Sequence, residues 1–88
     1  MEEFPRSPTT NLEDVSLVAF LMLKGHGIKE WRNVEDPTRI SFDIEGSPAD
    51  IEADIQNYND NEQVGIQDYV RCYKTVKSRM YNFKNLNR

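Results

Sequence analysis

The stretch RISFDIEGSPADIEADIQNY, residues 39–58, decides the fold because it joins a strand pattern directly to a helix pattern. Its first seven residues alternate strictly between polar and apolar, with the apolar ones at Ile40, Phe42 and Ile44. A period of two is typical of a strand that buries one face. The preceding run, 28–34, alternates less cleanly, and 35–38 has the composition of a turn. We therefore expect an antiparallel two-stranded hairpin with a loop of roughly four residues.

Two helices are expected to flank this hairpin. After it, Ser47 is a typical capping residue, and the apolar side chains that follow recur at helical spacing: Ile51, Ile55 and Tyr58. Before it, the segment from Leu12 to Lys24 is apolar nearly all round. Thr10 and Glu13 have capping-box spacing at its start, and Gly25 suits its end. A helix that is apolar on every side is expected either to lie at the centre of the core or to pack against a second surface.

A third helix is expected from Ile66 to Phe83, because its apolar residues fall within an arc of roughly 100°. They are Ile66, Tyr69, Tyr73, Val76, Met80 and Phe83. A two-stranded hairpin alone is marginal in water, so the three helices must cover it. The predicted fold is a small two-layer α+β domain with the order α-β-β-α-α. Residues 9–84 would form the domain, with a flexible N-terminal tail at 1–8 and a C-terminal tail at 85–88.

Charge is distributed very unevenly along the 88 residues, although the net charge is only −4. Residues 1–68 carry all 15 acidic side chains and 5 basic ones, whereas residues 69–88 carry 6 basic side chains and no acid. Such asymmetry either marks a surface for a partner or is neutralised within the fold. The sequence leaves both interpretations open.

Several classes of protein do not fit this sequence. The single cysteine, Cys72, excludes an internal disulfide and favours a reducing compartment. No apolar run approaches 18 residues, so we expect no membrane span. The opening MEEFPRSP is acidic and lacks the apolar stretch of a signal peptide. These features predict a cytoplasmic protein.

Catalytic and cofactor signatures are absent from the sequence. The one histidine, His26, lies between two glycines and is interpreted as a turn residue, because no Ser or Cys nucleophile stands at a recognisable spacing. The run Asn57-x-Asn59-x-Asn61 lacks the carboxylates and the glycine of a calcium loop. We therefore expect no enzymatic activity, no metal, no cofactor and no small-molecule substrate.

Two surfaces are candidates for binding a macromolecule. Trp31 stands on the weakly alternating strand, where it is either exposed or turned into the core by a bulge; an exposed tryptophan would indicate a protein interface. An acidic surface accompanies it: Asp43, Glu45, Asp50, Glu52 and Asp54. The alternative is a nucleic-acid surface on the last helix, made of Lys74, Lys77, Arg79, Tyr81, Lys84 and Arg88. Their bases ring the helix, whereas a phosphate-binding surface usually gathers them on one face.

The order of motifs also resembles a known family. The motifs are Ala19-Phe20-Leu21, Lys24-Gly25, Ile40-Ser41-Phe42, Tyr58-Asn59 and Lys77-Ser78-Arg79-Met80-Tyr81-Asn82. From about Thr9 to Asn82 the chain is similar to a small uncharacterised domain family found in phages and mobile-element-rich bacterial genomes. The resemblance implies a small phage-type accessory protein in the bacterial host cytoplasm. We expect it to bind a protein partner, either a host factor or itself, and keep nucleic-acid binding as the alternative.

Overall fold

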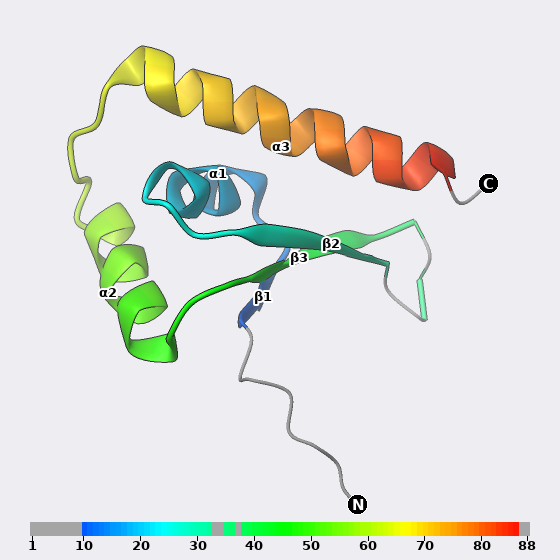
Figure 1. Cartoon of the computed structure of the whole chain (residues 1–88), viewed down its shortest axis with the longest axis horizontal. Helices are drawn as coiled ribbons and strands as arrows, with labels where there is room; N and C mark the ends of the chain where they lie inside the picture. The colour runs from blue at the N-terminus through cyan, green and yellow to red at the C-terminus, as the bar shows by residue number, and fades with distance from the viewer. Residues whose placement is uncertain (1–9, 33–34, 37, 87–88) are drawn as a thin grey trace, which may run out of the picture.

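The computed structural model describes residues 10–32, 35–36 and 38–86 (Figure 1). It confirms an α+β fold with three helices. The elements follow one another as β1 (Thr10–Leu12), α1 (Val15–Leu23), β2 (Ile28–Arg32), β3 (Ile40–Ile44), α2 (Pro48–Asn59) and α3 (Ile66–Leu86). The predicted N-terminal tail, 1–8, lies outside the described residues. The predicted C-terminal tail, 85–88, is wrong in its first half, because residues 85–86 belong to α3, and 87–88 lie outside the described residues.

In the part of the chain that the structure describes, the sheet has three antiparallel strands in the order β1-β3-β2, so the predicted two-stranded hairpin is incomplete. The added strand, β1, pairs along the free edge of β3, with Thr10 opposite Ile44 and Leu12 opposite Phe42. This pairing puts Leu12 on the same face as the fully buried Phe42. Because β3 is buried on its core face, a strand on each side satisfies its backbone polar groups and shields that face.

The start of α1 differs from the prediction for the same reason. Thr10 and Leu12 belong to β1, so the predicted capping box and the predicted helix start at Leu12 are wrong. Asp14 is the N-cap instead: its Oδ1 accepts hydrogen bonds from the backbone N–H of Ser16 (2.9 Å) and of Leu17 (3.3 Å). A carboxylate in this position satisfies two of the otherwise unpaired donors of the first helical turn.

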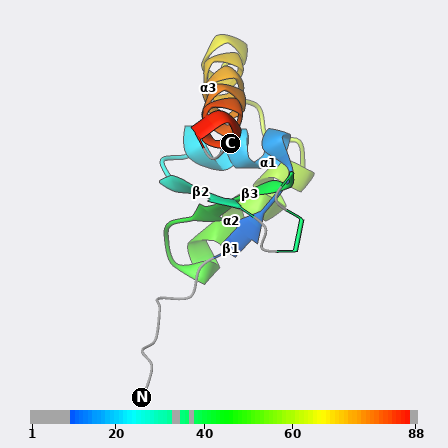
Figure 2. The same ribbon diagram turned by 90° about the vertical axis from the view of Figure 1, so that its right-hand side faces the viewer.

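The core lies between the sheet and two helices on one of its sides. Figures 1 and 2 show α1 and α3 on the same side of the sheet, with α1 next to the strands. Of the two positions that the sequence left open for α1, the structure has the one at the centre of the core, with four consecutive buried residues: Val18, Ala19, Phe20 and Leu21. They pack with Phe42 and Ile44 from β3, Ile51 from α2 and Val76 from α3.

Helix α2 does not cover the sheet as predicted. Ser47 caps it as expected, accepting from the Asp50 N–H at 3.1 Å, and Pro48 is its first residue. The short connection after β3 leaves the helix at the end of the sheet, where it packs on α1 (Figure 1). The aromatic rings of Tyr58 and Phe20 meet there at 5.4 Å between centroids.

Helix α3 largely confirms the predicted core arc. Tyr69, Tyr73 and Met80 pack against the core around the fully buried Val76. Ile66 is an exception: it begins the helix ahead of the contact with α1, and its side chain is 73% exposed. The helix also continues past the predicted end at Phe83 to Leu86. None of the helices in the described part of the chain has the length and apolar character needed to cross a bilayer.

Candidate functional site

The exposure of Trp31, which the sequence left undecided, follows from an unbroken strand register. Lys29 pairs with Asp43 and Trp31 with Ser41, so β2 has no bulge at Trp31. Glu30 and Arg32 therefore point toward α3, whereas Lys29 and Trp31 point to the opposite face. Trp31 is 44% exposed on that face.

We define the outer sheet face as Asn11, Lys29, Trp31, Ser41 and Asp43, one residue set drawn from all three strands. The indole Nε1 of Trp31 donates a hydrogen bond to the Asp43 carboxylate. Asn11 Nδ2 donates to the other oxygen of the same carboxylate at 2.7 Å. Asp43 therefore holds the indole in one orientation while leaving much of the ring in contact with solvent. Ordering this side chain before binding lowers the entropy that a complex would lose.

The other acidic candidates do not share one surface with Trp31. Glu45 follows β3, and the exposed Asp50 and Glu52 lie on the first turns of α2. Asp54 is partly buried, and its Oδ2 lies 2.7 Å from Nε2 of His26. The structure thus divides the predicted acidic surface between the sheet and α2.

His26 lies in the predicted turn between α1 and β2 and also links two elements. Its Nδ1 is 2.9 Å from the backbone oxygen of Glu45, while its Nε2 faces the Asp54 carboxylate. The imidazole thereby joins the end of β3 to the middle of α2. These contacts attach α2 to the sheet, so the role of His26 is structural.

Among the nucleic-acid candidates, Arg79 is engaged inside the fold. Its Nε and Nη2 donate to the two carboxylate oxygens of Glu30 at 2.8 and 2.9 Å, and Nη2 also donates to the Ile28 carbonyl oxygen at 3.0 Å. The hydrogen bond with Arg79 lowers the pKa of Glu30, and the same bond raises the pKa of Arg79. This pair fastens α3 to β2 and leaves few donors on Arg79 for a phosphate.

The remaining basic candidates lie on the exposed side of α3. Lys77 Nζ lies between two tyrosine rings, 5.9 Å from the centroid of Tyr73 and 5.6 Å from that of Tyr81. Lys74 is exposed, Tyr81 is half-exposed and Lys84 is half-buried. Arg88 lies outside the described residues. What the structure brings together is a small group of Lys74, Lys77 and Tyr81.

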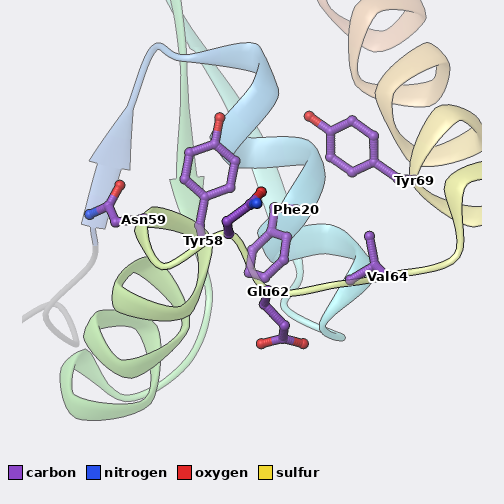
Figure 3. Close-up of a pocket in the computed structure, with 7 residues that line it drawn as sticks. Phe20, Tyr58, Asn59, Glu62, Val64 and Tyr69 are labelled. Atoms are coloured by element: carbon purple, nitrogen blue, oxygen red, sulfur yellow. The ribbon is translucent and has the colours of Figure 1, made fainter.

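The structure also contains a cleft that the sequence patterns did not indicate. Its volume is about 470 Å³, and it lies where α1, the end of α2 and the start of α3 meet (Figure 3). Its lining residues are Phe20, Tyr58, Asn59, Asn61, Glu62, Val64 and Tyr69. They come from separate segments, so only the Asn-rich connection between α2 and α3 was visible as a pattern. We call it the aromatic cleft because three of these residues are aromatic.

No group of three or more His, Cys, Asp or Glu side chains in the residues that the structure describes is arranged to hold a metal ion.

Comparison with known proteins places these features in a family. Neither a curated protein nor a solved structure matches the chain. One family, described as a domain of unknown function (DUF5659), matches residues 9–82. This range spans the outer sheet face, the aromatic cleft and α3 as far as Asn82, and it agrees with the resemblance expected from the motifs. The protein belongs to the DUF5659 family.

Proposed function

We propose that this protein is a small non-enzymatic accessory protein that binds another protein through its outer sheet face. The observation that carries the proposal is Trp31, a large aromatic side chain held in place on a face that α1 and α3 leave uncovered. Tryptophan is enriched among the residues that dominate binding energy at protein interfaces. Complete burial of an aromatic side chain removes roughly 150–250 Å² from water, and because Trp31 is 44% exposed, roughly 70–110 Å² of this remains for a partner to cover.

The surroundings of Trp31 fit an interface with an apolar centre and a polar rim. Lys29 is exposed beside it, and an ion pair joins Arg39 Nη2 to Glu13 Oε1 at 2.5 Å on the adjoining surface. Both signs of charge are thus available around one aromatic anchor. Charges at the rim select and orient a partner more than they contribute to affinity.

The partner is either a host factor or a second copy of the chain. The phage-type setting and the cytoplasm of a bacterial host belong to this proposal; they rest on the resemblance of the motifs and on the absence of a disulfide pair in the sequence. Acidic groups on α2, Asp50 and Glu52, lie near the end of the sheet and would favour a partner with a basic margin.

The test compares three immobilised proteins exposed to a nuclease-treated host lysate: wild type, Trp31→Ala and the control Tyr81→Ala. Tyr81 is an exposed aromatic side chain on α3, so its removal matches the loss of apolar surface at a different place. We expect a partner that wild type and Tyr81→Ala retain, with at least about 30-fold weaker binding to Trp31→Ala. Light scattering on the purified chain distinguishes self-association. Equal retention by all three proteins, together with a monomeric mass in solution, would overturn the proposal.

Nucleic-acid binding is a second candidate, favoured by the grouping of Lys74 and Lys77 around Tyr81 on one side of α3. Electrostatic binding to phosphates weakens steeply as salt rises. A gel shift at low salt should then show a complex that Lys74→Glu with Lys77→Glu abolishes, while Arg71→Glu on the opposite flank has less effect. Absence of a complex at low salt would eliminate this candidate.

A further inference from the structure

The aromatic cleft combines flat apolar walls with polar groups that have no partner in the described part of the chain. Figure 3 shows Tyr58 and Tyr69 on its two sides with Phe20 between them. Phe20 is almost completely buried and forms part of the apolar lining. The Tyr69 hydroxyl donates to the Ser16 carbonyl oxygen at 3.0 Å and is satisfied. The Tyr58 hydroxyl and the Asn61 side-chain amide bond to no other described residue, so both are available to a ligand.

The local charge of the cleft is balanced. Lys24 Nζ lies 2.7 Å from the Glu62 carboxylate and 5.8 Å from the centroid of the Phe20 ring. This hydrogen bond raises the pKa of Lys24, which keeps the ammonium group charged beside Glu62. Figure 3 shows the Glu62 carboxylate turned away from the three aromatic rings. An uncharged ligand therefore suits the space between the rings better than an ion does.

The volume and the shape of the lining restrict the ligand further. A cavity of about 470 Å³ is within the range that holds small organic ligands. Aromatic walls favour a planar group, because stacked and edge-to-face contacts add to the burial of apolar area. A purely hydrocarbon ligand would cover the Tyr58 hydroxyl and the Asn61 amide without replacing their hydrogen bonds to water, which is costly.

We propose that the aromatic cleft binds the uncharged heteroaromatic base of a nucleoside. The amide of Asn61 offers a donor and an acceptor side by side. Nucleobase edges present an adjacent donor and acceptor, and asparagine amides pair with such edges in two-point contacts. An indole or a phenol has only one polar atom, so it would pair with the donor or with the acceptor of the Asn61 amide but not with both. The base would lie against the tyrosine rings as bases do on aromatic side chains of single-strand binders.

The backbone at Asn61 supplies a matched variant. Asn61 has φ of 63°, in the left-handed region that glycine also adopts readily. Asn61→Gly therefore removes the amide while keeping the turn. Tyr58→Phe removes the hydroxyl and keeps the ring that contacts Phe20. Trp31→Ala, on the outer sheet face, is the control that leaves the cleft unaltered.

The test is a two-dimensional NMR titration of the full-length protein with adenosine, guanosine, cytidine and uridine, each added separately. We expect shifts of the backbone amide signals of Tyr58, Asn61, Val64 and Tyr69, with a dissociation constant on the order of 0.1–1 mM for the best nucleoside. Asn61→Gly and Tyr58→Phe should each weaken binding about fivefold, and Trp31→Ala should leave it unchanged. The spectrum of each free variant shows whether it has folded, and a folded Asn61→Gly with wild-type affinity would overturn the hydrogen-bonding argument.

Two further probes separate the sources of an aromatic group. A short single-stranded oligonucleotide that shifts the same signals more tightly than a nucleoside identifies nucleic acid as the source of the base, whereas weaker or absent shifts identify the free nucleoside. N-acetyltryptophanamide represents the aromatic side chain of a protein. If it binds as tightly as the best nucleoside, or if no nucleoside shifts the cleft signals, the proposal is wrong.

Discussion

Replacing Arg79 by alanine should test how α3 is fastened to the sheet. The substitution removes three hydrogen bonds: two to the Glu30 carboxylate and one to the Ile28 carbonyl oxygen. An exposed ion pair contributes about 0–1 kcal/mol, whereas removing one partner of a buried pair costs about 3–5 kcal/mol. Here Glu30 is 18% exposed and Arg79 is 36% exposed. We therefore expect Arg79→Ala to lower the free energy of unfolding by about 2 kcal/mol.

The same helix provides a control for this measurement. Arg71 forms an ion pair with Asp68 one turn away, at 3.2 Å, and the two side chains are 72% and 58% exposed. Arg71→Ala removes the same type of residue from α3 and should cost less than about 0.5 kcal/mol. Urea unfolding followed by circular dichroism gives both values. A loss for Arg79→Ala that equals the loss for Arg71→Ala would refute the assignment of Arg79 as a structural residue.

The pH dependence of the free energy of unfolding tests the stabilisation by the Glu30–Arg79 pair independently. The pKa of Glu30 is lowered in the folded state, mainly by its hydrogen bond to Arg79, from an ordinary value of 4.5. The unfolded chain therefore binds a proton more readily than the folded one, so this stabilisation is present above pH 4.5 and is lost as pH falls through the folded-state pKa. The difference between wild type and Arg79→Ala should be full at pH 7 and should shrink progressively below pH 4.5.

Four other substitutions test the fold. Asp14→Ala should lower the free energy of unfolding in urea by about 1 kcal/mol, because it removes the N-cap of α1. Glu13→Ala removes only an exposed ion pair and should lower it by less than about 0.5 kcal/mol. A larger loss for Glu13→Ala than for Asp14→Ala would favour the capping box predicted from the sequence. Phe42→Ala should cost about 3–5 kcal/mol, since this side chain is fully buried, and cooperative thermal unfolding is expected to disappear. Gly46→Ala should lower the melting temperature, because Gly46 has φ of 134° and an added Cβ would stand 2.8 Å from His26 Nδ1.

The elements that could be predicted are those whose sequence pattern lies within one continuous segment. The alternation at Ile40, Phe42 and Ile44 identified β3, and the Ser47-Pro48 pair located the start of α2 to the residue. These signals act locally: a period of two sets which side chains share a face, and a capping side chain bonds to the next turn. Tertiary contacts then had only to confirm them.

The parts that were missed depend on contacts between distant segments. β1 has only three residues, Thr10 to Leu12, and nothing in them distinguishes a strand from a helix start. It is a strand because it pairs with the open edge of β3, 30 to 34 residues further along the chain. The aromatic cleft is similar, because Phe20, Tyr58 and Tyr69 belong to three helices and each ring taken alone has the spacing of a core residue. Sequence periodicity shows which face of a helix is apolar. It does not show where the apolar faces of two helices leave a cleft between them.

The charge asymmetry of the sequence survives folding to a large extent. Within the described residues, two of the bases after residue 68 pair with acids from the preceding part: Arg79 with Glu30, and Arg71 with Asp68. Lys74, Lys77 and Lys84 form no ion pair with an acid among the described residues, while Asp50 and Glu52 remain exposed on α2.

Because surface charges act over roughly 8–10 Å at physiological salt, the lysines of α3 and the acids of α2 present fields of opposite sign to an approaching molecule. Such fields orient a partner before contact but supply little of the final affinity. An anchor that excludes water is still needed, and Trp31 is a side chain whose exposure and fixed orientation suit that role.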